Sequence, residues 1–84
     1  MEDKLLSRWA VDYFLQALAY YDRALQYNDQ DESSFVNRAI TKAIIKDTNG
    51  ALNDFGKALI LSPKAAHIYF NRGNLYSSLG TFRF

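Results

Sequence analysis

The sequence contains no cysteine among its 84 residues, and only one proline and four glycines. The absence of thiols excludes disulfides and every metal site built on cysteine, and it favours a reducing compartment. The scarcity of proline and glycine leaves long stretches without helix breakers. The formal net charge is only +1, and lysine and arginine are scattered along the chain. We therefore expect neither nucleic acid nor an anionic membrane as a partner.

Targeting and catalytic signals are also missing from the sequence. No apolar run approaches the roughly 20 residues needed to cross a bilayer, and the N-terminal MEDKLLSRW lacks the pattern of a secretory signal. This predicts a cytoplasmic protein, or alternatively a nuclear one. The single histidine, His67, has no second histidine or cysteine with which to form a zinc site. Because no phosphate-binding glycine loop or nucleophile with a histidine partner is found either, the sequence predicts no enzyme activity and no cofactor.

What the chain does contain is apolar residues at helical spacing, and they predict an all-α fold. The stretch 4–27 is predicted to hold at least one helix, and its pattern favours two, the stronger at 16–27. Asp31 or Ser33 can cap a helix over 32–46, and residues 47–50 are expected to form a turn. A helix from about residue 51 then ends before Pro63, and the last, over 65–79, ends at Gly80.

Two parts of the chain have similar sequences: residues of the first part match residues that stand a fixed number of positions later in the second. We call this number of positions the repeat offset. The identical pairs at this offset are Ala17 and Ala51, Leu18 and Leu52, Ala24 and Ala58, Leu25 and Leu59, Asn37 and Asn71, and Arg38 and Arg72. Conservative pairs follow the same offset, for example Tyr21 with Phe55 and Phe35 with Tyr69. Helical repeats of this kind stack on one another, so function is expected on a shared surface and not in a deep pocket.

The repeat resembles the tetratricopeptide repeat. Its spacing of alanine, aromatic residue, alanine and proline is matched by Ala51, Phe55, Ala58 and Pro63, and the following helix matches through Tyr69, Gly73 and Tyr76. The resemblance implies antiparallel helical hairpins stacked as an α-solenoid fragment. It implies one domain over 1–84, comprising the end of a first repeat with an irregular N-terminal helix (1–30), a complete repeat (31–65) and the first helix of a third (66–84). These are about two and a half repeats of a longer array.

The repeat spacing also predicts how the helices pack. Small residues should let the helices approach closely, and two aromatic residues should fill the space between hairpins. The small residues are Ala39, Ala51, Ala58 and Gly73, and the aromatic residues are Phe55 and Tyr69. Most other aromatic residues are interpreted as core, whereas Asp22 and Asp54 are expected on the solvated sides of their helices.

The candidate binding residues share one face of two predicted helices. They are Val36, Asn37, Ile40 and Ile44 in one helix, and His67, Phe70, Asn71 and Asn74 in the other. In proteins that this sequence resembles, this face lines a concave groove, and asparagines at the positions of Asn37 and Asn71 bind the backbone of an extended peptide. An amide both donates and accepts hydrogen bonds, so it can bind a peptide unit of any sequence. Asparagine is also common at this place whatever the repeat binds, and both interpretations stay open.

The sequence thus predicts a protein-interaction module, a scaffold or adaptor, that binds an extended, apolar or neutral peptide segment. The alternative is a structural segment that self-associates through its uncapped C-terminal helix, as a homodimer. Residues assigned to this second surface are Tyr69, Tyr76, Leu79, Phe82 and Phe84. An RNA-binding helical repeat is a remote third hypothesis, because such proteins pair their aromatic residues with clustered basic ones.

Overall fold

The structure, a computed structural model, describes residues 7–80, and within this range every regular element is an α-helix. The four helices are α1 (Arg8–Tyr27), α2 (Glu32–Ile44), α3 (Thr48–Leu61) and α4 (Ala66–Ser78). This confirms the all-α class. The predicted helices over 32–46 and 65–79 are present with ends that differ by one or two residues, and Gly80 follows α4 with a left-handed φ of 72°.

Side-chain caps explain where three of the helices begin. Ser7 accepts a hydrogen bond from the Ala10 amide at the start of α1, and Asp31 accepts one from the Ser34 amide at the start of α2. Asp47 does the same for the Gly50 amide, so α3 begins at Thr48. The predicted turn over 47–50 is therefore wrong, because the aspartate initiates the helix and residues 48–50 form its first turn.

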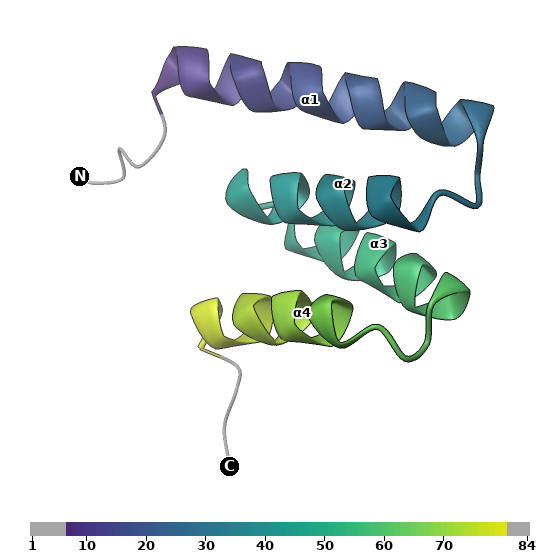
Figure 1. The fold of residues 1–84 in the computed structure, drawn as a ribbon. Helices are drawn as coiled ribbons and strands as arrows, with labels where there is room; N and C mark the ends of the chain where they lie inside the picture. The colour runs from purple at the N-terminus through teal and green to yellow at the C-terminus, as the bar shows by residue number, and fades with distance from the viewer. Residues whose placement is uncertain (1–6, 81–84) are drawn as a thin grey trace.

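α1 is one continuous helix of 20 residues, so the two helices favoured by the sequence pattern are not found within the described residues. No proline or glycine interrupts the stretch from Ser7 to Tyr27, and nothing in it forces a break. α1 is much longer than α2, the helix against which it packs (Figure 1).

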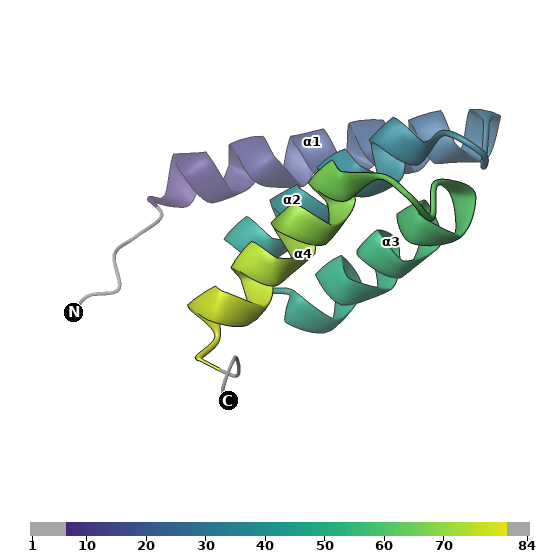
Figure 2. The ribbon, with the colours of Figure 1, turned by 60° about the horizontal axis from the view of Figure 1, so that its bottom comes forward.

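Successive helices run in alternating directions, so α2 and α4 point the same way (Figure 1). α2 packs against α1, α3 and α4, whereas α1 contacts only α2 among the four helices. Figure 2 shows α4 lying across the pair formed by α2 and α3, on the side away from α1. α2 is thus the central helix, with α1 on one side and α4 on the other.

The core lies mainly between α2 and α3. Three alanines predicted to allow close helix approach, Ala39, Ala51 and Ala58, are fully buried, and Phe55 fills the space beside them. The interpretation of most other aromatic residues as core is wrong, because the exposed ones include Trp9, Tyr13, Tyr20, Tyr27, Phe70 and Tyr76. Two packing predictions about single residues are also wrong. Gly73 is exposed, with open space where a Cβ would stand, and Tyr69 lies on the surface with its ring beside the Arg72 guanidinium. No other described helix covers the face of α4 that carries them.

Two glycines in α3 provide a test of the local structure. A Cβ added at Gly56 meets nothing within 4 Å, whereas one at Gly50 would lie 2.8 Å from Cγ of Asp47 and would displace the capping carboxylate. We expect Gly56→Ala to raise the free energy of unfolding by about 0.5 to 1 kcal/mol through helix propensity. We expect Gly50→Ala to lower it by up to about 1 kcal/mol, because the cap is lost. Urea unfolding followed by circular dichroism measures both, and equal effects would contradict the capping role of Asp47.

Candidate functional site

A shallow apolar hollow lies between the parallel helices α2 and α4. It has a volume of about 240 Å³ and is lined by Ile40, Ala43, Ile44, Phe55, Asn71, Asn74, Leu75 and Ser78. Phe55 comes from α3 and belongs to the core, so it forms the floor beneath the two helices. Hydrocarbon from α2 and amide and hydroxyl groups from α4 form the walls. Pockets for small molecules are typically larger, from about 300 Å³. The hollow is therefore better suited to a side chain of a peptide.

The structure brings four of the eight predicted groove residues together in this hollow: Ile40, Ile44, Asn71 and Asn74. Val36 is not available to a ligand, because it is buried in the core. Its position shows that the face of α2 buried against its neighbours is wider than the stripe predicted from spacing. Asn37 and Phe70 are exposed and lie outside the hollow.

His67 closes the other end of the interface between α2 and α4. Its Nε2 atom lies 3.1 Å from Oε2 of Glu32, and these two residues belong to the first turns of α4 and α2. The predicted groove therefore has an ionisable pair at the N-terminal ends of the helices and the apolar hollow toward their C-terminal ends.

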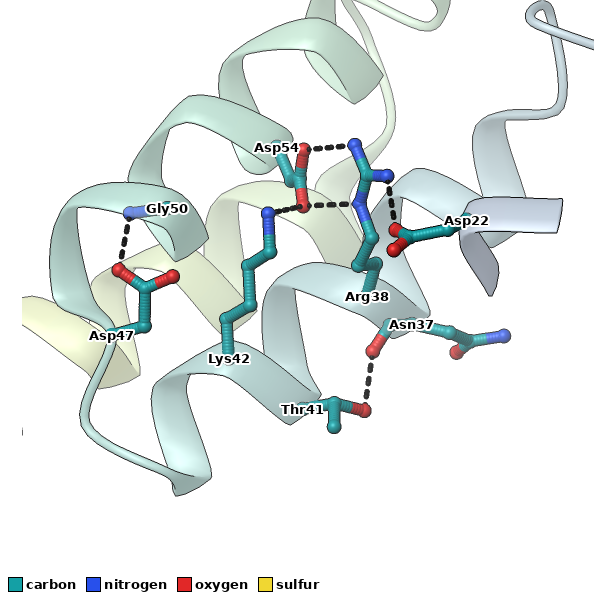
Figure 3. A network of polar contacts seen from close by, with 8 residues as sticks. All are labelled: Asp22, Asn37, Arg38, Thr41, Lys42, Asp47, Gly50 and Asp54. Carbon is teal, nitrogen blue, oxygen red and sulfur yellow. Dashed lines mark hydrogen bonds and ion pairs between the residues drawn. The ribbon is translucent and has the colours of Figure 1, made fainter. Parts of the chain in front are cut away.

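Behind the groove, an ionic cluster joins α2 to both α1 and α3 (Figure 3). The Arg38 guanidinium donates from Nε and Nη2 to the two carboxylate oxygens of Asp54, both at 2.8 Å. Its Nη1 atom donates to Oδ1 of Asp22 at 2.7 Å. The Lys42 ammonium lies 3.1 Å from Oδ2 of Asp54. Two positive and two negative side chains thus form a neutral group.

The Asp54 carboxylate is completely buried, with an exposed fraction of 0%. Burial by itself would raise its pKa, but hydrogen bonds and positive charge from Arg38 and Lys42 outweigh that effect, so the pKa lies below its ordinary value. The hydrogen bond to Asp54 raises the pKa of Arg38, against a smaller opposing effect of burial. Both groups are therefore held in their charged forms. A carboxylate saturated in this way acts as a structural anchor for α2 on α3.

The expectation that Asp22 and Asp54 lie on solvated helix sides is correct for Asp22 and wrong for Asp54. The sequence contains a signal that would have located the buried carboxylate. Asp54 stands three residues after Ala51 and four before Ala58, and is therefore on the apolar stripe of its helix. Arg38 and Lys42, spaced by four residues, offer two cations on one face of the preceding helix.

Three of the residues predicted for self-association lie on an exposed face of α4 and just beyond its end. Tyr69, Tyr76 and Leu79 are all exposed, and the Tyr69 hydroxyl donates to the Pro63 carbonyl. The other two, Phe82 and Phe84, lie outside the described residues.

Comparison with known proteins adds no relative. No family model matches the chain, and no match is found among the curated proteins or the solved structures. Within residues 7–80 there is no group of three or more histidine, cysteine or acidic side chains placed to bind a metal ion. None of the described helices is long and apolar enough to cross a membrane.

Proposed function

We propose that this chain is a protein-interaction module of the tetratricopeptide type, in which the groove between α2 and α4 binds an extended, apolar or neutral peptide. The observation that carries the proposal is the hollow itself, whose walls combine Ile40 and Ile44 with the amides of Asn71 and Asn74. Apolar side chains of a peptide would enter the hollow, while the amides bind its backbone.

The helix boundaries support the repeat. α2 spans Glu32–Ile44 and α4 spans Ala66–Ser78, so both ends of α4 follow those of α2 by the repeat offset of the sequence. The end of α3 follows the end of α1 by the same interval. The offset found in the sequence is thus also the offset of the helices, as expected for about two and a half stacked repeats of a longer array.

The composition of the hollow favours a peptide over RNA. None of its lining residues is charged, and a site for nucleic acid would place lysine or arginine beside its stacking surfaces. Asp54, the buried carboxylate within the described residues, is paired with Arg38 and Lys42 and so is not positioned as a general base. Binding without chemistry is the activity that this site supports best.

The test begins with a peptide selected from a display library against the immobilised chain. We expect Asn71→Ala and Asn74→Ala each to weaken its binding by about 1 to 3 kcal/mol, because a peptide group loses a hydrogen-bonding partner. The melting temperature should stay nearly unchanged, since neither side chain belongs to the core. Asn53→Ala is the matched control, because Asn53 is an exposed asparagine of α3 outside the hollow. Calorimetric titration measures the affinities. If the parent chain and the three variants bound the peptide equally well, the asparagines would not be part of the binding site.

Self-association through α4 is the second proposal, supported by the exposure of Tyr69 and Leu79 along one side of the helix and its end. It predicts that Leu79→Glu lowers the mass of any assembly measured by analytical ultracentrifugation. An unchanged mass would eliminate this surface.

A further inference from the structure

A face of α1 beside the stripe that packs on α2 carries a second regular pattern, which the repeat offset does not explain. Tyrosine recurs every seven residues, and alanine recurs every seven residues between the tyrosines. In order along the helix these six residues, which we call the α1 seam, are Ala10, Tyr13, Ala17, Tyr20, Ala24 and Tyr27. The spacing alternates between three and four residues, which is the a/d pattern of helices that pack in a coiled coil.

The α1 seam is not covered by any described helix. α1 contacts only α2 among the described helices. The exposed fractions are 65% for Tyr13, 70% for Tyr20 and 95% for Tyr27, and the neighbouring Trp9 is 75% exposed. An aromatic surface of this extent on a small protein usually marks an interface.

The equivalent surface of α3 shows what covers such alanines. Ala51 and Ala58, the repeat equivalents of Ala17 and Ala24, are fully buried, and the helix that packs most closely on α3 is the antiparallel α2. Ala17 and Ala24 remain partly exposed on α1. No helix within the described residues takes the position on α1 that the antiparallel α2 takes on α3.

We propose that the α1 seam is a dimer interface, occupied by the α1 helix of a second copy of this chain in antiparallel orientation. When Ala17 faces Tyr20 of the second copy, Tyr13 faces Ala24 and Ala10 faces Tyr27. Every layer then pairs one large residue with one small one, and the two-fold symmetry repeats each contact. A parallel pair would instead stack tyrosine on tyrosine and alanine on alanine, which leaves uneven gaps.

A hollow on the seam has the shape that this packing requires. It is lined by Tyr20, Arg23, Ala24 and Tyr27, with a volume of about 240 Å³. These four residues are spaced as i, i+3, i+4 and i+7, and four residues of one helix form the hole that receives a side chain of the facing helix. Ala24 is the floor of this hole. In the antiparallel register, the side chain that enters it is Tyr13 of the second copy.

The area and charge of the surface fit a second copy better than a membrane. The rings of Trp9, Tyr13, Tyr20 and Tyr27 together expose on the order of 600 Å². Two copies that covered this surface completely would bury at most about 1,200 Å² of aromatic area, which is at the low end of the range for stable protein interfaces. The charged residues of α1 are two arginines and two aspartates, so the helix offers no excess of positive charge to a lipid surface. This inference does not depend on the groove between α2 and α4.

Analytical ultracentrifugation over a range of concentrations tests the interface. We expect the chain to form dimers, and Tyr20→Glu to raise the dissociation constant at least about 30-fold, because it places two carboxylates against alanine at the centre of the seam. Ile60→Glu, at an exposed apolar position of α3, should leave the dimer unchanged. Leu79→Glu distinguishes this interface from the alternative surface on α4, because only self-association through α4 would be lost in that variant. Circular dichroism confirms that each variant is folded. A strict monomer, or a dimer lost through Leu79→Glu and kept by Tyr20→Glu, overturns the proposal.

Single-cysteine variants test the orientation, since the chain has no cysteine of its own. Ala10→Cys and Tyr27→Cys should form a mixed disulfide when the two variants are combined, and neither should form one alone. In the antiparallel dimer identical positions lie about 25 Å apart, given a rise of about 1.5 Å per residue. Cross-linking of each variant with itself would show a parallel pair and reject the antiparallel register.

Discussion

Asp54→Asn is expected to lower the free energy of unfolding by about 3 kcal/mol. The substitution removes the negative charge that Arg38 and Lys42 share behind the groove, and it leaves two partly buried cations to face a neutral amide. A domain of this size has a total stability of roughly 4 to 12 kcal/mol, so the loss is a large part of it. Urea unfolding monitored by circular dichroism gives the value directly.

Asp22→Asn is the matched control, because Asp22 binds the same guanidinium from an exposed position. Exposed ion pairs contribute less than about 1 kcal/mol, so this variant should lose much less stability than Asp54→Asn. Equal losses would show that burial of the carboxylate is not what makes the cluster important. Replacing Arg38, Lys42 and Asp54 together by Leu or Met should cost less than Asp54→Asn alone, since no unpaired buried charge remains and Asp22 is exposed to solvent.

The stability of the parent chain and of Asp54→Asn can also be compared as a function of pH. The pKa of Asp54 is lowered on folding, so its contribution is present above the ordinary carboxyl pKa of about 4 and is lost as the pH falls through the folded value. The stability difference between the chain and Asp54→Asn should therefore stay constant around neutral pH and shrink in acid below about pH 4.

Ala58→Asp is expected to unfold the protein. Ala58 is fully buried in α3, and an aspartate there would stand one turn after Asp54, whose neighbouring cations are already engaged. An unpaired buried charge beside a like charge costs several kcal/mol, comparable to the whole stability of the domain. Far-UV circular dichroism and the dispersion of amide proton resonances measure the outcome.

Ile60→Asp is the control for this substitution, because the Ile60 side chain lies on the same helix and is 79% exposed. It should leave the fold intact. A folded Ala58→Asp protein with the melting temperature of the parent would refute the close packing of α2 on α3 around the buried alanines.

The helix ends that depend on neighbouring residues could be predicted from the sequence. Features that depend on contacts between helices could not. Asp31 as a cap and Gly80 as a terminator act within a few residues, so they can be recognised in the sequence. The partners of Arg38 lie 16 residues away on each side, and pairing over that distance depends on how the helices pack. Periodicity in one helix could not show that Asp54 meets two cations.

The candidate site was predicted in part for the same reason. Ile40, Ile44, Asn71 and Asn74 share a hollow because their spacing places them on facing sides of α2 and α4. Val36 follows the same spacing, yet it is buried, because α2 is the central helix and has neighbours on several sides. The width of a buried face depends on the number of packed neighbours, which a single helical pattern does not contain.

The dependence of α1 on a single neighbour makes stability uneven along the chain. Leu25 is the one buried side chain that α1 contributes among the described residues, whereas α2 and α3 supply most of the core. Local unfolding of α1, with the rest of the protein intact, therefore exposes little of the buried core and is a low-cost opening of the structure. A second copy bound to α1 would favour its folded form by mass action, so that dimerisation and the local folding of this helix become linked equilibria.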